Sequence, residues 1–286
     1  MLGLVRWLSR RSLRTLHAWG GLAGWLSVAL SPSYRRRLRA NAALAGVSAA
    51  ERRASVAEAG RLVLEMPRLW LQPADRPIGE TVHWDGVERL EAKLGHPGGL
   101  VILTPHMGCF EIAAQSYAER FGARQPLTVL YRPARQAWLR EFEETARLRP
   151  NLATAPASLA GVRQMIRALR RGESVGLLPD QVPPEGQGVW APFFGQPAYT
   201  MTLAARLVHQ TGAQVLVLWS ERLPKGRGYV VHVSDLAEPL PPAGDDEAAA
   251  RAVNRSMEAL IRQHPAQYLW GYHRYKSPRR QPAVEG

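Results

Sequence analysis

The stretch LVILTPHMGCFEIAAQ, residues 100–115, decides the fold class. It opens with a short apolar run of the kind that forms a strand buried on both faces of a parallel sheet. A turn containing Pro105 and Gly108 follows, and apolar residues then recur at helical spacing. A buried strand, a tight turn and a helix in succession begin a βαβ unit, so this stretch predicts an α/β fold.

The same alternation is repeated along the chain. Strands are predicted at residues 100–104, 127–131, 174–178, 215–220 and 229–233, and helices at 108–121, 136–149, 158–171, 200–211 and 245–264. Ser48 and Glu51 form a capping-box pattern that opens a further helix, which Pro67 should end or kink. The glycine-rich turn at 225–228 makes the last strand pair antiparallel. We therefore expect a mostly parallel sheet flanked by helices, with a long, Pro-rich and Gly-rich functional loop at 179–199.

His106 and Glu111 are the residues that carry chemistry in the opening stretch. Five residues on a regular helix place side chains about 140° apart, so the two meet only if His106 lies in the turn before the helix. A carboxylate on one imidazole nitrogen fixes the tautomer and leaves the other nitrogen free to accept a proton. The first N–H groups of the helix would stabilise an oxyanion, and Gly108 would let a substrate approach closely.

This arrangement contains no nucleophilic serine, and it therefore suggests direct attack by a substrate hydroxyl on an activated acyl group. An isolated H-x4-E match also occurs by chance, with the histidine serving a structural role. Cys109 stands near His106 and offers a thiol nucleophile, but a cysteine at a helix start within an apolar run is more often a small core side chain.

The N-terminal segment from Thr15 to Tyr34 contains no charged residue and is just long enough to cross a hydrocarbon core of about 30 Å. Three glycines and Pro32 weaken it as a helix, whereas Trp19 and Trp25 favour a membrane interface. Arginines lie on both sides, which suits a helix at or in an anionic leaflet. A cleaved signal peptide and a soluble packed helix are the alternatives.

Composition limits the possible partners without choosing among them. The net charge of +13 calls for an acidic partner, whether nucleic acid, anionic lipid or an acidic carrier protein. Only three of the 37 basic residues are lysines, so most of the positive charge is guanidinium, which suits phosphate, although a GC-rich coding bias gives the same excess. The single cysteine excludes an intramolecular disulfide and a cysteine-cluster metal site. We expect no metal and no cofactor.

Further motifs follow the opening stretch in a consistent order. They are Tyr131-Arg132-Pro133, Arg147-Leu148-Arg149, Leu178-Pro179-Asp180-Gln181, Pro192-Phe193-Phe194-Gly195 and the block YLWGYHRYK at 268–276. Together with HMGCFE they resemble the signature blocks of the bacterial lipid A late acyltransferases, a branch of the glycerolipid acyltransferases. This resemblance extends over nearly the whole chain.

The resemblance implies transfer of a fatty acyl chain from acyl carrier protein to a hydroxyl of a Kdo-bearing lipid A precursor, at the cytoplasmic face of the inner membrane. It makes His106 and Glu111 catalytic, and Arg147 and Asp180 substrate-binding, with Arg132 and Arg149 as further candidates. From the N-terminal segment and the polar C-terminal end, we expect three parts: a membrane-anchoring helix with basic flanks (1–40), an α/β acyltransferase domain (41–276) and a polar tail (277–286).

Three alternatives are weighed against this function. An esterase or thioesterase would use the same groups with water as the acceptor, but the chain has no G-x-S-x-G motif. Another membrane glycolipid or phospholipid is also a possible acceptor on the same chemistry. A nucleic-acid-binding protein is suggested by the charge alone, because no basic-aromatic recognition block is present. We therefore expect no nucleic-acid partner.

Overall fold

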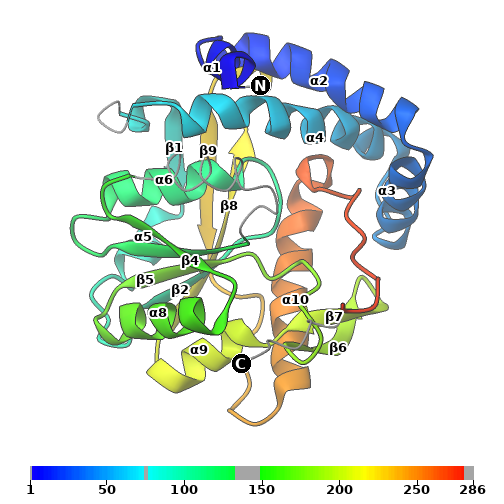
Figure 1. The fold of residues 1–286 in the computed structure, drawn as a ribbon. Coiled ribbons are helices and arrows are strands. Elements are labelled where there is room, and N and C mark those ends of the chain that lie inside the picture. Colours follow the sequence, from blue (N-terminus) through cyan, green and yellow to red (C-terminus); the bar gives the residue numbers. More distant parts are fainter. Residues whose placement is uncertain (1, 74–76, 133–148, 280–286) are drawn as a thin grey trace.

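The computed structural model describes residues 2–73, 77–132 and 149–279 (Figure 1). The expected helix at 136–149 lies almost wholly outside these residues. The described α-helices are α1 (Leu2–Ser9), α2 (Leu13–Leu30), α3 (Pro32–Leu44), α4 (Ala49–Trp70), α5 (Val87–Glu91), α6 (Phe110–Arg120), α8 (Leu159–Arg170), α9 (Leu203–Thr211) and α10 (Asp246–Gln263). The strands are β1 (Val82–Asp85), β2 (Leu100–Leu103), β3 (Leu127–Tyr131), β4 (Leu152–Pro156), β5 (Ser174–Leu177), β6 (Gly188–Phe193), β7 (Gln196–Met201), β8 (Gln214–Arg222) and β9 (Tyr229–Ser234). Short 3₁₀ turns lie at Gly79–Thr81, Pro224–Gly226 and Pro265–Gln267.

A seven-stranded sheet forms the centre of the fold, in the order β1-β9-β8-β2-β5-β3-β4. Neighbouring strands in it run parallel except for β8 and β9, which are antiparallel as the turn at 225–228 predicts. The expected mixed α/β fold with a mostly parallel sheet is confirmed.

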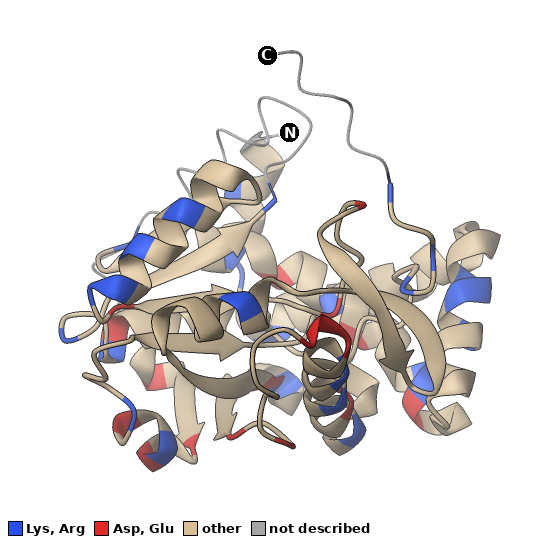
Figure 2. Ribbon diagram, turned by 90° about the horizontal axis from the view of Figure 1, so that it is seen from below, with Lys and Arg blue, Asp and Glu red and all other residues tan. Residues whose placement is uncertain are grey.

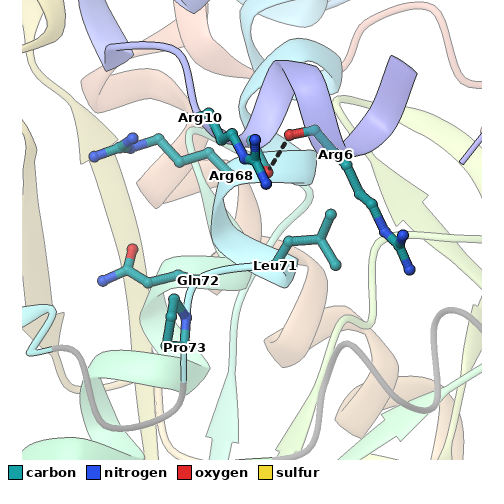
Figure 3. A pocket seen from close by; sticks show the side chains of 7 residues that line it. Arg6, Arg10, Arg68, Leu71, Gln72 and Pro73 are labelled. Carbon is teal, nitrogen blue, oxygen red and sulfur yellow. Dashed lines mark hydrogen bonds between the residues drawn. The ribbon is translucent and has the colours of Figure 1, made fainter. Parts of the chain in front are cut away.

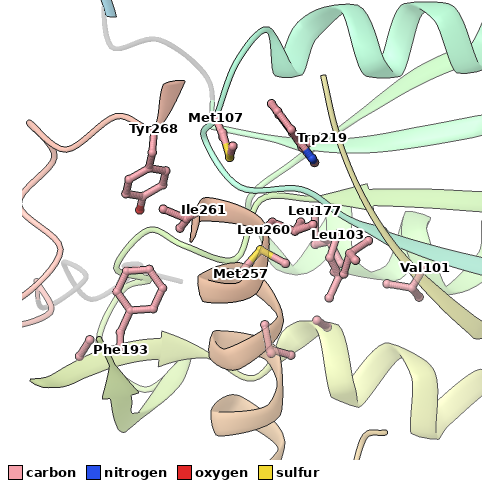
Figure 4. Packing of buried hydrophobic residues seen from close by; sticks show 14 of the residues in the cluster. Val101, Leu103, Met107, Leu177, Phe193, Trp219, Met257, Leu260, Ile261 and Tyr268 are labelled. Atoms are coloured by element: carbon pink, nitrogen blue, oxygen red, sulfur yellow. The ribbon is translucent and has the colours of Figure 1, made fainter. Parts of the chain in front are cut away.

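Both faces of the sheet are covered by helices (Figure 1). On β2, Leu100 and Ile102 belong to one buried apolar cluster, and Val101 and Leu103 belong to the other. Since side chains alternate along a strand, a strand buried on both faces must be apolar at every position. The cluster on the α10 side includes Met257 and continues to the C-terminal segment, as Figure 4 shows.

The helices α1, α2 and α4 form an outer layer above α6 (Figure 1). Helices α2 and α4 approach closely where glycines face each other: a Cβ on Gly60 would lie 2.0 Å from the carbonyl oxygen of Gly20. A Cβ on Gly24 would likewise lie 2.0 Å from the carbonyl oxygen of Val56. The glycines of α2 therefore allow the backbones of α2 and α4 to approach closely. The sequence analysis considered only their low helix propensity and did not predict this packing role.

The uncharged N-terminal segment is divided between two helices, because α2 ends at Leu30 and Ser31 caps α3. Within the described residues, none of the helices combines the length and the apolar character that crossing a bilayer requires. The anchoring role of this segment stays a prediction, as do the domain boundaries.

The structure differs from the expected local structure in one segment, extends one helix by three residues and adds two strands. The segment 179–199 contains the hairpin of β6 and most of β7, whose turn places Phe194 and Gly195 at φ of 46° and 75°. Two positive φ values in succession are those of a tight hairpin turn. The helix α4 continues past Pro67 to Trp70. The strands β1 and β4 were not predicted, because VHWD and LATAP are short and carry few branched residues.

Candidate active site

Strand register brings His106 and Asp180 together. The strands β2 and β5 are adjacent and parallel, and Leu103 is aligned with Leu177. His106 and Asp180 each follow three residues later, at the carboxyl ends of their strands. Side chains at the carboxyl ends of adjacent parallel strands meet at one edge of the sheet, where α/β proteins commonly bind ligands.

Both nitrogens of the His106 ring are hydrogen-bonded. Nδ1 lies 2.7 Å from Oδ1 of Asp180, and Nε2 lies 3.0 Å from the side-chain amide nitrogen of Gln181. The backbone N–H of His106 also donates to Oδ2 of Asp180, at 3.0 Å. Asp180 therefore fixes the ring in the tautomer that carries its proton on Nδ1, and the Nε2 lone pair accepts from Gln181. An Nε2 held in this form is a proton acceptor.

Asp180 is a buried carboxylate, with 1% of its surface exposed. Burial raises its pKa, but the charge and hydrogen bonds of His106 and the charge of Arg274 outweigh burial and hold the pKa below its usual value. Asp180 is thus ionised at neutral pH and offsets the charge of a protonated imidazole.

The carboxylate at Nδ1 of His106 is that of Asp180, and not that of Glu111 as the sequence analysis expected. Glu111 lies in the first turn of α6. Phe110, the first residue of α6, packs its ring edge-on to the ring of His106, with ring centroids 5.1 Å apart. The family resemblance places Asp180 among the substrate-binding residues by its motif position. Its contact with His106 depends on pairing between β2 and β5, which spacing along the chain does not reveal.

Gly108 is required by the fold at this turn. Its φ is 58°, and a Cβ would lie 1.9 Å from the carbonyl oxygen of Ser220 on β8. We expected this glycine to let a substrate approach, but the backbone of β8 occupies the space where a side chain would project. Glycine is favoured here because it adopts positive φ and tolerates close backbone packing.

The backbone amides of the turn are largely engaged. Those of Met107, Gly108 and Cys109 donate to the carbonyls of Pro105, Gln267 and Ser220 respectively, at 2.7, 2.9 and 2.9 Å. These three N–H groups are therefore not available to an oxyanion. The prediction of an oxyanion site therefore rests on the N–H groups of the first turn of α6 alone.

The C-terminal motif lies directly against the turn. The backbone N–H of Leu269 donates to the carbonyl of His106, at 3.2 Å, and Met107 forms a β-bridge with Tyr268. The hydroxyl of Tyr272 accepts from the backbone N–H of Val182, one residue after Gln181. A motif that is distant in sequence, 90 residues from Val182 and farther from His106, thus supports both halves of the site.

A buried charge cluster supports the turn from the other side. Its central pair is Arg222, at the end of β8, and Glu65, on α4; Glu65 has no exposed surface. Glu65 also accepts hydrogen bonds from His17 Nε2 at 2.9 Å and from the Tyr229 hydroxyl at 3.0 Å. Arg222 in turn donates to the carbonyl of Gly108, at 3.1 Å. This charge cluster connects α2 and α4 with the His106 turn, and the sequence analysis did not find it.

Burial raises the pKa of Glu65, but the charge and hydrogen bonds of Arg222 and His17 outweigh burial and lower the pKa to about 2. Glu65 is therefore fully ionised at neutral pH. An ion pair this deeply buried is stable only when its remaining hydrogen-bonding groups are satisfied, as they are here by His17 and Tyr229.

Cys109 is fully buried in the core. Burial raises the pKa of its thiol well above the usual value, and the charge of Glu65 adds to this. A buried, protonated thiol is a poor nucleophile, which favours the interpretation of Cys109 as a core residue.

The arginine candidates have different locations. Arg132 is exposed immediately after β3, at the same sheet edge as His106. Arg149 is partly buried, and its backbone forms an isolated β-bridge with Leu152. Burial lowers the pKa of its guanidinium. Arg147 lies outside the described residues. The structure thus puts Arg132 at the same edge as the His106–Asp180 pair.

Comparison of the sequence with known protein families gives a match over nearly the whole chain. A profile of the family "Bacterial lipid A biosynthesis acyltransferase" matches residues 2–277. The chain belongs to this family.

Several relatives from Escherichia coli (strain K12) carry names of that kind. The chain is 28% identical to a lipid A biosynthesis lauroyltransferase over 76% of its own length and 69% of that protein. It is 26% identical to a palmitoleoyltransferase over 80% and 74%, and 25% identical to a myristoyltransferase over 92% and 87%. The chain is thus similar to enzymes named for different acyl chains, and the family supports an acyltransferase role in lipid A biosynthesis.

Proposed function

We propose that this acyltransferase moves a fatty acyl chain from acyl carrier protein to a hydroxyl of a lipid A precursor of the Kdo-lipid IVA type. The observation that carries the proposal is the His106–Asp180 pair at the carboxyl edge of the sheet, in a chain of the lipid A acyltransferase family. The pair provides a base with an ionised partner, which is the chemistry that transfer to an unactivated hydroxyl requires.

In the proposed reaction, the acceptor hydroxyl displaces the amide of Gln181 from Nε2 of His106. Nε2 takes the hydroxyl proton as the oxygen attacks the thioester carbonyl carbon. The new C–O bond forms, the C–S bond breaks, and the imidazolium returns the proton to the departing thiolate. Asp180 holds the ring through Nδ1 and offsets its transient positive charge.

Glu111 remains a catalytic residue in this proposal, as the second carboxylate of the H-x4-E motif. Asp180 occupies Nδ1, so we assign Glu111 to charge compensation from the first turn of α6 and not to ring orientation. Arg147, Arg132 and Arg149 are proposed to bind anionic groups of the substrates, because a guanidinium forms two parallel hydrogen bonds with a phosphate or carboxylate.

The test uses the purified full chain with acyl carrier protein charged with a radiolabelled acyl group and a Kdo-lipid IVA acceptor. His106→Ala and Asp180→Asn should each lower kcat by about 10² to 10⁴. His209→Gln, an exposed histidine on α9, is the matched control and should leave the rate unchanged. Loss of acyl groups to water with no labelled lipid product would instead identify a thioesterase.

We further propose that α1 and α2 hold the enzyme at the inner membrane, with the catalytic domain on the cytoplasmic side. The outer surfaces of these helices expose large apolar side chains: Leu4, Trp7, Trp19, Leu22, Trp25, Leu26 and Leu30. Those of α2 lie opposite the buried residues that pack on α4. Exposed tryptophans and leucines with arginines on both flanks are typical of helices that lie in a membrane interface.

A triple substitution of Leu22, Leu26 and Leu30 by serine tests this location. These side chains are exposed by 72%, 56% and 74%, so their replacement should preserve the fold. The variant should sediment with anionic vesicles about tenfold less than the intact chain, because it removes three of the seven exposed apolar side chains, among them the two most exposed. Equal sedimentation of the two proteins would reject the anchoring role.

A further inference from the structure

A cavity lies between α1 and the C-terminal end of α4, away from the His106 turn. Its volume is about 510 Å³. It is lined by Arg6, Ser9, Arg10, Arg68, Leu71, Gln72 and Pro73. A volume of this size suits a small molecule or a lipid headgroup.

The lining is cationic and contains no carboxylate. Arg6 lies on α1 and Arg10 follows directly after this helix, and within the described parts of the chain neither forms a salt bridge. Arg68 faces the same cavity from α4, where its Nη1 donates to the carbonyl of Arg11 at 2.9 Å. The three guanidinium groups are spread around the cavity and do not converge on one point (Figure 3). This spacing suits a ligand with more than one anionic oxygen group.

Arginines also gather elsewhere on the surface, for example on α3, which contains no acidic residue. Lys and Arg are spread over many elements, as Figure 2 shows, and the cavity differs from these other clusters in its concave shape. Several exposed arginines elsewhere do have acidic partners, such as Arg206 with Asp246 and Arg255 with Glu238. The cavity therefore combines a concave shape with positive charge that has no acidic partner among the residues the structure describes, which is the setting in which an anion binds.

The position of the cavity indicates the source of the anion. Trp7 and Leu4 lie with Arg6 on α1, directly before Arg10, and they are 45% and 61% exposed. Trp7 stacks on Trp19 of α2, with ring centroids 5.5 Å apart, and thereby continues the apolar surface of α2. A ligand in the cavity would thus have its charged groups beside an apolar surface, which is the arrangement of a lipid headgroup at a bilayer.

We propose that this cavity binds the phosphate groups of an anionic lipid headgroup. Guanidinium groups pair with phosphate oxygens through charge-assisted and often bidentate hydrogen bonds. A terminal phosphate group carries three acceptor oxygens and up to two negative charges, so it can pair with more than one guanidinium, whereas a carboxylate carries two oxygens and one charge. The inference goes beyond acyl transfer, because it concerns lipid binding and holds whether or not the proposed reaction is correct.

The cavity is also connected to the candidate active site. Gln115, on the second turn of α6, donates through Nε2 to the carbonyl of Leu69, two residues before the cavity residue Leu71, at 3.4 Å. The helix that begins at the His106 turn therefore packs against one wall of the cavity. A lipid bound there would be held on the same side of the sheet as α6.

The experiment measures binding of the intact chain to phosphatidylcholine vesicles that contain phosphatidic acid, by flotation at fixed ionic strength. The double variant Arg6→Gln/Arg10→Gln should bind these vesicles about tenfold more weakly or worse, because it removes two charged phosphate donors. The matched control is Arg36→Gln/Arg39→Gln, which removes two exposed arginines from α3, at the other end of the outer layer (Figure 1). The control should lose only a few-fold in affinity. All four residues are exposed, so both variants should unfold at the midpoint of the intact chain.

Two comparisons identify the ligand. Vesicles with the same negative charge supplied by oleate should bind the intact chain more weakly, and the cavity variant should lose little on them. Inorganic pyrophosphate should displace the protein from phosphatidic acid only at millimolar concentration.

Equal losses for the two double variants, or equal binding of the intact chain to oleate vesicles, would overturn the proposal. It would also be overturned if free pyrophosphate bound tightly while the cavity variant bound vesicles normally. In a parallel assay with an oligonucleotide, a loss of binding that is confined to the oligonucleotide would overturn it as well.

Discussion

Substitution of Glu65 by Gln tests the buried charge cluster, because it removes the negative charge and preserves most of the shape. The pKa of Glu65 is about 2, against 4.5 for a free carboxyl. A difference of about 2.5 pH units corresponds to ~3 kcal/mol of folding free energy at neutral pH. Breaking a buried ion pair from one side costs about 3–5 kcal/mol by comparison. We therefore expect Glu65→Gln to lose about 3 kcal/mol of unfolding free energy.

Urea denaturation at pH 7 measures this loss. Glu173→Gln is the control, since Glu173 pairs with the exposed Arg171 through two hydrogen bonds of 2.6 and 2.9 Å. An exposed pair of this kind contributes about 1 kcal/mol or less. The combined variant Glu65→Gln/Arg222→Met should lose less than the sum of its single substitutions, because the two residues share one interaction.

The pH dependence gives a second test of the same pair. A carboxyl whose pKa is lower in the folded state stabilises the fold above its unfolded pKa and loses this effect as pH falls through its folded pKa. The difference between the intact chain and Glu65→Gln should thus be full above about pH 4.5 and should disappear towards pH 2. If Glu65→Gln and Glu173→Gln have the same unfolding midpoint at pH 7, the cluster does not stabilise the fold as we argue.

Other predictions concern the site and the helix layer. Cys109→Ala should retain most acyl-transfer activity in the labelled-donor assay, because its thiol is buried and protonated; an acyl group trapped on Cys109 would contradict this. Gln181→Ala should lower kcat much less than Asp180→Asn, because Gln181 contacts the nitrogen that the acceptor must reach whereas Asp180 holds the ring. Gly24→Ala should cost about 1–3 kcal/mol in thermal unfolding, because its Cβ would meet the Val56 carbonyl. Gly3→Ala, which meets nothing within 4 Å, should cost almost nothing.

Local patterns were enough to predict most of the parallel sheet. The apolar strands, the antiparallel last pair and the capping box of α4 follow from periodicity and turn chemistry. The hairpin of β6 and β7 was missed because its prolines and glycines also fit an irregular loop. Its turn needs positive φ at Phe194, a non-glycine residue, and tertiary packing makes that conformation acceptable.

The sequence by itself determined that His106 stands in a strand–turn–helix unit and that the chain resembles the lipid A acyltransferases, because both are properties of neighbouring residues and their order. Only the tertiary structure decided that Asp180 holds the His106 ring, since this depends on the register of β2 with β5. The same is true of Arg222, Glu65 and the Gly108 carbonyl, which three separate elements bring together. Hydrogen bonds and buried charges depend on distances in space, and spacing along a chain fixes such distances only within one helix, strand or turn.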